Sequence, residues 1–225
     1  MRMLLLFLVT ICCAMAGNIV TNGGFETGDL TGWTTNRNAL DPWIIGPPGY
    51  SSQGGPSSAH SGLYFVTEGC DVLGGPCVGA GATEDYLYQD LTTVPGGIYT
   101  LSFYYDQGRE CGGGTCELEV LFGGVSVLDL KLSSGRNTDP GYSFYSVTGL
   151  TATSTTTRLQ FDGNQDYSFD ALDDVSVSQI PEPTSLILGG IGLLTLGLCR
   201  SRIGSRSVPC DGDAGSRSET PLALR

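Results

Sequence analysis

The stretch Glu117–Leu132, which reads ELEVLFGGVSVLDLKL, predicts the fold class of the chain. Apolar and polar residues alternate on both sides of Gly123-Gly124, which is the pattern of two strands joined by a two-residue turn. An antiparallel sheet with one face in water requires such alternation, because successive side chains point to opposite faces. The stretch therefore predicts a β-hairpin within an antiparallel sheet.

Similar alternating stretches recur along the middle of the chain. Apolar side chains at Tyr99, Leu101 and Phe103 share one face of such a stretch. The 34 glycines of the chain favour tight turns between short strands. The predicted strands cover residues 62–67, 85–91, 98–105, 117–122, 125–132, 142–148, 156–161 and 172–178. This many strands in one domain predicts an all-β fold, a two-sheet antiparallel sandwich.

The charge of the middle region excludes one class of partner. Between Gly17 and Ile180 there are 19 Asp and Glu residues and 5 Lys and Arg residues. Such an acidic domain repels a phosphate backbone, so we expect no nucleic-acid partner. The same carboxylates offer oxygen ligands to a hard cation such as Ca²⁺.

The N-terminus has the pattern of a secretory signal peptide. Arg2 is followed by a short apolar run and then by Ala14-Met15-Ala16, a small-x-small cleavage site. We expect residues 1–16 to form a signal helix that is removed after Ala16. The exported folded domain then covers residues 17–180.

The C-terminus combines a rigid turn with a short apolar run and a basic end. Pro181-Glu182-Pro183 precedes an uncharged run from Leu186 to Leu198, and Arg200 and Arg202 follow it. Pro183 excludes a helix that continues through it, so a helix is expected to begin after it. The run predicts a short transmembrane helix, with its arginines in the cytoplasm and the domain outside.

This segment, from Pro181 to about Arg206, closely resembles the PEP-CTERM sorting signal of exopolysaccharide-producing bacteria. The resemblance implies recognition by an exosortase-type processing enzyme. The protein would then be anchored to the membrane by the C-terminal helix before processing, and afterwards lie at the cell surface or outside the cell. Residues 207–225 extend beyond the usual end of the signal, and their composition is typical of a disordered tail.

A second resemblance covers the domain itself. Asn22–Trp33 (NGGFETGDLTGW), Ala59–Tyr64 (AHSGLY) and Leu172–Val177 (LDDVSV) resemble, in this order, the opening, middle and closing segments of galactose-binding-like jelly rolls. Many carbohydrate-binding modules share this fold. The resemblance implies a jelly-roll arrangement of the sandwich, but it does not identify a ligand.

The jelly-roll resemblance also implies a structural Ca²⁺ between the opening and closing strands, at Glu26 and Asp173. Alternation places Asp173 on the same face as Val175 and Val177, so its carboxylate is expected to point inward and to need a partner. The alternative is that Glu26 and Asp173 accept hydrogen bonds from loop amides without a metal.

Four cysteines remain in the exported domain, namely Cys70, Cys77, Cys111 and Cys116. An even number in an oxidising compartment predicts two disulfides. Three pairings are open, and we favour Cys70–Cys77 with Cys111–Cys116, because each pair brackets a Gly-rich loop. Zinc is the competing interpretation, but neither pair has the Cys-x-x-Cys spacing and His60 is the only histidine. We expect His60 to be structural.

Two aromatic residues are the candidates for stacking on a sugar ring. Trp43 and Tyr50 lie in the long Pro-, Gly- and Ser-rich stretch 37–58, whereas Trp33 belongs to the opening motif and is expected in the core. A loop tryptophan that binds sugar would be exposed over a groove. A loop tryptophan with a structural role would be buried.

No sequence motif indicates catalysis, since the chain has no Gly-x-Ser-x-Gly elbow, phosphate loop or His-Glu-x-x-His. The sequence predicts an exported, non-catalytic domain that binds a partner, and extracellular polysaccharide is the favoured ligand. A structural matrix protein without a sugar pocket is the first alternative. A glycoside hydrolase that uses two carboxylates in a cleft is the second.

Overall fold

The structure is a computed structural model that describes residues 17–35, 43–50, 58–69, 85–108, 116–132, 141–164 and 168–181. All of them belong to the first of two units, Met1–Pro181, and the second unit, Glu182–Arg225, lies outside the described residues. The predicted signal helix, C-terminal helix and tail therefore lie outside them as well. Within the described part of the chain, no helix has the length and apolar character needed to cross a bilayer.

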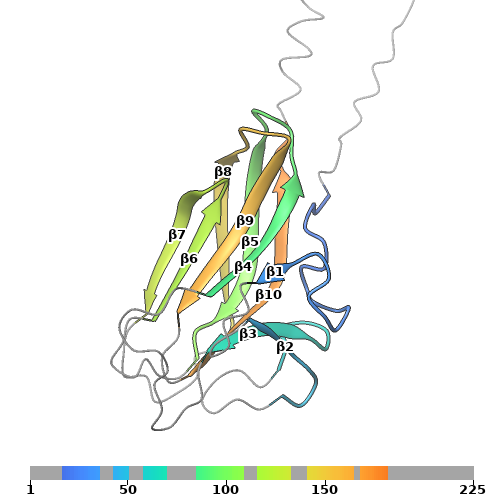
Figure 1. Ribbon diagram of the computed structural model, residues 1–225, viewed down its shortest axis with the longest axis vertical. Coiled ribbons are helices and arrows are strands. Elements are labelled where there is room, and N and C mark those ends of the chain that lie inside the picture. Colours follow the sequence, from blue (N-terminus) through green and yellow to red (C-terminus); the bar gives the residue numbers. More distant parts are fainter. Residues whose placement is uncertain are drawn as a thin grey trace, which may run out of the picture. The chain divides into compact units, whose positions relative to one another are not determined.

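The described strands form two five-stranded antiparallel sheets (Figure 1). The first has the order β1-β4-β9-β6-β7 and the second the order β2-β3-β10-β5-β8. The strands are β1 (Thr34–Thr35), β2 (Ile44–Gly46), β3 (Phe65–Gly69), β4 (Asp85–Thr92), β5 (Ile98–Asp106), β6 (Cys116–Phe122), β7 (Val125–Leu132), β8 (Ser143–Thr151), β9 (Thr156–Asn164) and β10 (Phe169–Gln179). The predicted all-β, two-sheet antiparallel sandwich is confirmed.

The hairpin predicted from Glu117–Leu132 is formed by β6 and β7. Glu117 pairs with Lys131, and the strands meet at Gly123 and Gly124, whose φ values are 64° and 79°. Both turn residues thus lie in the left-handed region, which glycine enters without the steric penalty that a side chain would add.

The alternation of apolar residues places the core where the sequence predicted it. Leu101, Phe103 and Tyr105 of β5 are fully buried, and so are Leu118 and Val120 of β6. The inner faces of both sheets meet in one cluster of buried side chains. The expectation that Trp33 belongs to this core is also confirmed.

Two details differ from the predicted strands. Residues 62–64, which were expected to begin a strand, form a turn instead, and β3 runs from Phe65 to Gly69. Gly62 has a φ of 67°, which is not strand geometry. The very short strands β1 and β2 were not predicted, because two or three residues cannot show a periodic pattern.

Candidate functional site

A β-bulge in β10 decides which way the aspartates of the closing strand point. Leu172 pairs with Tyr105, and both side chains are buried in the core. Val177 is buried in the core too, although it lies an odd number of residues further along the strand. The register shifts between Asp173 and Ser176, and this irregularity brings both apolar residues to the inner face.

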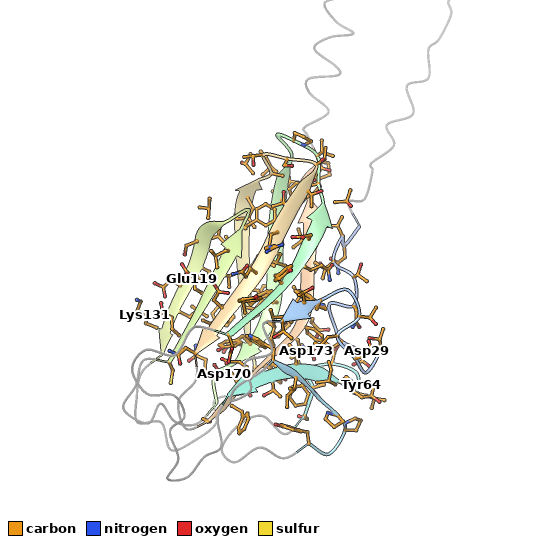
Figure 2. All side chains as sticks on the ribbon, in the orientation of Figure 1. Asp29, Tyr64, Glu119, Lys131, Asp170 and Asp173 are labelled. Carbon is orange, nitrogen blue, oxygen red and sulfur yellow. The ribbon has the colours of Figure 1, made fainter. Side chains whose placement is uncertain are left out.

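Asp173 therefore lies on the outer face of the sheet, where it pairs with Tyr104. Its side chain is labelled in Figure 2. The expectation that Asp173 shares a face with Val175 and Val177 is wrong, because the bulge reverses the alternation between them. The neighbouring Asp174 has a φ of 51°, a conformation that Asp adopts more readily than most residues. The carboxyl group of Asp173 is nevertheless completely buried, at 0% exposure.

A loop covers Asp173 and supplies two of its three hydrogen bonds. Its Oδ2 accepts hydrogen bonds from the backbone N–H groups of His60 (2.9 Å) and Ser61 (3.1 Å), and its Oδ1 accepts one from the N–H of Asp174 (2.7 Å). Burial raises the pKa of Asp173 to about 7, although the three backbone donors act in the opposite direction. The carboxyl group anchors the loop to the bulge.

Glu26 anchors the same loop from the opening segment. Its Oε1 accepts hydrogen bonds from the N–H groups of Leu63 (2.9 Å) and Tyr64 (3.0 Å). A Cβ atom at Gly62 would lie 2.3 Å from this oxygen, so a larger residue would displace the carboxylate from these N–H groups, and the φ of 67° also favours glycine. Glu26 and Asp173 thus hold the two ends of the turn formed by residues 60–64.

These contacts bear on the predicted calcium site. Both Glu26 and Asp173 direct carboxylate oxygens at N–H donors, which compete with a cation for the same lone pairs. Among the described residues, no group of three or more His, Cys, Asp and Glu side chains could hold a metal ion. These contacts fit amide anchoring of a loop, and the structural Ca²⁺ at Glu26 and Asp173 stays a prediction.

The opening segment joins the closing strand through its backbone. The N–H of Val175 donates to the carbonyl of Gly23 at 2.9 Å, and a Cβ atom at Gly23 would lie only 2.0 Å from the Val175 carbonyl oxygen. The Nε1 of Trp33 donates to the carbonyl of Asn22 at 3.1 Å. The opening motif therefore serves packing against the bulge.

Four rings meet on the outer face of the second sheet, and we call them the aromatic patch: His60, Tyr104, Tyr142 and Phe144. His60 stacks on Tyr104 with ring centroids 3.5 Å apart and an interplanar angle of 15°. Tyr142 contacts the edge of His60, and Phe144 contacts Tyr104 at 5.2 Å between centroids. Phe144 is 59% exposed, which leaves a phenyl ring in contact with solvent.

Polar groups surround these rings. The Nδ1 of His60 lies 2.7 Å from Oδ2 of Asp174, and the Ser61 hydroxyl donates to Oδ1 of Asp174 at 2.8 Å. The Tyr142 hydroxyl donates to the carbonyl of Ser58 at 3.2 Å. The patch thus combines an exposed apolar ring with a carboxylate, an imidazole and hydroxyl groups held in fixed positions.

His60, which is expected to be structural, contributes a partly exposed ring to the aromatic patch. Sequence analysis did not single out Tyr104, Tyr142, Phe144 or Asp174 for this patch. The alternation in β5 placed Tyr104 on the outer face, but no pattern could indicate that His60 would lie against it.

The two predicted sugar-stacking residues are placed differently. Trp43 is only 1% exposed, and its Nε1 donates to the carbonyl of Asp85 at 2.9 Å inside the sandwich. This burial is what the structural alternative predicts for Trp43, since the loop folds the indole inward against Gly163. Tyr50 is half-buried, with its ring edge-to-face against Phe65 at 5.9 Å.

The cysteines and the sorting residues lie mostly outside the described residues. Cys116 takes part in a disulfide, but Cys70, Cys77 and Cys111 are not described, so the pairing stays a prediction. Pro181 is described and exposed. Glu182, Pro183, Arg200 and Arg202 are outside the described residues.

A second polar group lies inside the sandwich, which sequence analysis missed. The Tyr105 hydroxyl donates to Oδ2 of Asp170, and both residues are completely buried. Burial raises the pKa of Asp170 well above its usual value, although the bond from Tyr105 lowers it. The other carboxyl oxygen of Asp170 has no hydrogen-bond partner among the described residues.

Comparison with known proteins identifies the C-terminal segment. Residues 179–202 match the PEP-CTERM protein-sorting motif. The chain is thus a PEP-CTERM-bearing protein, and this motif implies an exported, exosortase-processed protein of the cell surface. No curated protein matches the sequence.

Comparison with solved structures concerns the domain. The Stig cyclase Fisc from Fischerella sp. TAU has a TM-score of 0.52 at 17% identity, over 75% of this chain and 99% of that one. The module TmCBM61 in complex with β-1,4-galactotriose has a TM-score of 0.49 at 17% identity, over 72% and 99%. The CBM22-1 xylan-binding domain from Paenibacillus barcinonensis has 0.44 at 15%, over 75% and 98%. The domain is similar in structure to such β-sandwich proteins, and this likeness shows the fold alone.

Proposed function

We propose that the folded domain is a non-catalytic polysaccharide-binding module of an exported surface protein, and that the aromatic patch is its binding surface. The observation that carries the proposal is the exposed ring of Phe144, which contacts Tyr104, the ring on which His60 stacks while His60 also contacts the carboxylate of Asp174. The jelly-roll arrangement predicted from the opening and closing motifs belongs to this proposal.

The chemistry of the patch suits a sugar. A pyranose ring has an apolar face of C–H groups, which gains contact area on an aromatic ring such as Phe144. Its hydroxyl groups need donors and acceptors at the edge of that ring. The carboxylate of Asp174 offers acceptor oxygens and the imidazole of His60 offers its second ring nitrogen, and binding sites commonly combine such an apolar surface with a few fixed polar groups.

The hydrogen bonds around Asp174 lower the conformational entropy that side chains of the patch would lose on binding a ligand. Asp174 already accepts from Ser61, and His60 is held by both its ring stack and its contact with Asp174. A ligand therefore meets side chains that have already lost much of their rotamer freedom. In contrast, Phe144 is largely exposed and gains a partner on binding.

A structural matrix protein without a sugar site remains the second candidate. The burial of Trp43 favours it, because the residue that sequence analysis assigned to sugar stacking serves the core instead. This observation does not concern the aromatic patch, and the two candidates differ in whether Phe144 contributes to retention on a glycan.

The test is retention of the full chain, in detergent micelles, on a panel of immobilised neutral and acidic polysaccharides. Phe144→Ala is expected to weaken binding about tenfold, which corresponds to about 1.4 kcal/mol. Val125→Ala is the matched control, because Val125 is equally exposed but lies in β7 of the other sheet. Equal retention of both variants would exclude the patch as the binding surface. If the folded wild-type chain is retained on no glycan, the structural candidate is favoured.

A further inference from the structure

One end of the sandwich carries no charged side chain among the residues that the structure describes. The strands β4, β8 and β10 finish at this end, where β5 and β9 begin (Figure 1). We call it the tag-side end and define it as residues 93–98, 151–155 and 180–181. None of these positions is Asp, Glu, Lys or Arg, although 19 acidic residues lie between Gly17 and Ile180.

Backbone hydrogen bonds hold the three segments of the tag-side end together. The N–H of Gly96 donates to the carbonyl of Ala152 at 2.8 Å, and the N–H of Ala152 donates to the carbonyl of Gly97 at 3.0 Å. The N–H of Ile180 donates to the carbonyl of Ile98 at 2.7 Å. The end is therefore a defined surface and not a set of separate loops.

Three large apolar side chains are exposed on this surface. Val94 is 54% exposed, Ile98 is 45% exposed and Ile180 is 41% exposed. The N–H of Gly97 donates to the carbonyl of Val94 at 2.8 Å, and Ile98 follows Gly97 in the chain. Together with the hydrogen bond from Ile180 to Ile98, this bond connects the backbone at all three residues. Asp90 and Arg158, which precede and follow two of the segments in the chain, neutralise each other in an ion pair at 2.8 Å. An uncharged surface with exposed apolar side chains is typical of a contact with a partner or a membrane.

The sorting motif begins on this surface. The matched residues start at 179, and Gln179 is the last residue of β10. No spacer separates the folded domain from the motif. Four residues lie between Pro181 and the apolar run that begins at Leu186. Full extension over this distance reaches about 17 Å, so the domain cannot lie far from wherever the apolar run lies.

We propose that the tag-side end rests on the lipid headgroup and acyl boundary of the membrane while the sorting segment is held there. The headgroup region of one leaflet is about 5–8 Å thick, so a tether of this length keeps the domain at the bilayer surface. A strongly acidic face would be repelled by anionic lipids, whereas an uncharged face is not. Transfer of the exposed apolar side chains from water to this boundary is favourable, and these are Val94, Ile98 and Ile180.

This arrangement would present Pro181-Glu182-Pro183 at the membrane surface, where a membrane-bound processing enzyme can reach it. It would also direct the opposite end of the sandwich away from the membrane. Phe144 lies near the beginning of β8, and β8 finishes at the tag-side end. The aromatic patch therefore remains accessible while the tag-side end is covered.

The experiment measures contact with lipid in the full chain. Val94→Trp and Phe144→Trp variants are incorporated into mixed phosphatidylcholine and phosphatidylglycerol vesicles, with or without brominated acyl chains, which quench tryptophan. The native Trp33 and Trp43 are buried and give a constant background. We expect loss of emission from Val94→Trp on bromination and none from Phe144→Trp.

A second measurement separates lipid contact from contact with a protein. Val94→Ser is compared with Phe144→Ser for the rate of tag removal in cells that contain the processing enzyme. Quenching of Val94→Trp together with slower processing of Val94→Ser supports the proposal. Equal quenching at both positions, or none at Val94, overturns it. Slower processing without quenching would mean that the surface binds the processing enzyme and not lipid, which also overturns it.

Discussion

The ring of His60 lies almost parallel to the ring of Tyr104, with centroids 3.5 Å apart. This stack joins a loop near the start of the domain to the C-terminal half of β5. The loop is held at two further points, because the carboxyl groups of Glu26 and Asp173 accept its backbone N–H groups. One ring stack and two carboxyl anchors thus fix the surface that we propose binds polysaccharide.

The stack gives the first prediction. His60→Ala removes both the ring contact and the interaction with Asp174, and we expect the free energy of unfolding to fall by about 1–2 kcal/mol. His60→Phe keeps the ring and removes only the polar contact, so it should lose less. Urea unfolding of both variants measures the difference. If the two variants lose the same amount, the stack contributes nothing to stability.

The buried carboxyl group of Asp173 predicts a pH dependence. Its pKa is about 7 in the folded protein and about 3.8 when unfolded, so the folded state holds this proton more tightly. Its contribution to stability is complete below about pH 4 and is lost as the pH rises through 7. The raised pKa of Asp170 likewise makes the folded protein less stable as the pH rises.

Asp173→Asn is the variant that isolates this group. Asparagine does not titrate here, so the decline of unfolding free energy between about pH 5 and 8 should be smaller than in the wild type. Thermal unfolding at several pH values measures the slope. The control is Asp29→Asn, at a surface carboxyl group whose pKa is lowered by hydrogen bonds from Thr31 and Thr27. This variant should leave the slope between about pH 5 and 8 unchanged, because Asp29 is ionised throughout that range. An unaltered slope in Asp173→Asn would mean that Asp173 is ionised throughout.

The contact between Gly23 and Val175 predicts a steric effect. A methyl group at Gly23 would lie 2.0 Å from the Val175 carbonyl oxygen, so Gly23→Ala must displace the opening segment from the bulge. Gly124→Ala meets no atom within 4 Å and suffers only from its positive φ, at about 1 kcal/mol. We expect Gly23→Ala to lower the unfolding temperature well below that of Gly124→Ala. A loss no greater than in Gly124→Ala would contradict this.

Removal of metal tests the calcium prediction. Because Glu26 and Asp173 are held by backbone donors, we expect a chelator to leave the unfolding temperature unchanged. The measurement is calorimetry with excess chelator and with added Ca²⁺. A lower unfolding temperature in chelator, restored by Ca²⁺ but not by Mg²⁺, would instead support the predicted structural ion.

Much of the fold could be predicted because alternation is a local property. The stretches around Phe103 and Val120 alternate without interruption, and their inward faces are buried as expected. The same rule failed at Asp173, because a single bulge shifts every later residue to the opposite face. The sequence contains no separate signal for the bulge, apart from an Asp at a position that needs positive φ.

The candidate site was less predictable. Trp43 was a candidate for sugar stacking because it lies in a loop, and the sequence left open whether its indole is exposed or buried; the loop turns the indole into the sandwich. The aromatic patch draws on residues from the loop at His60, from β5 and from the chain around the start of β8. These segments are distant in sequence, and no periodicity relates them.

The sequence by itself determined the strands, the acidic character of the domain and the sorting motif, since each depends on residues that are neighbours along the chain. Only the tertiary structure decided that Asp173 faces outward, that Trp43 is buried and that His60 lies on Tyr104. The physical reason is that these outcomes depend on how two sheets and their loops fill space together. Which groups approach each other there is set by packing and hydrogen bonding between distant segments.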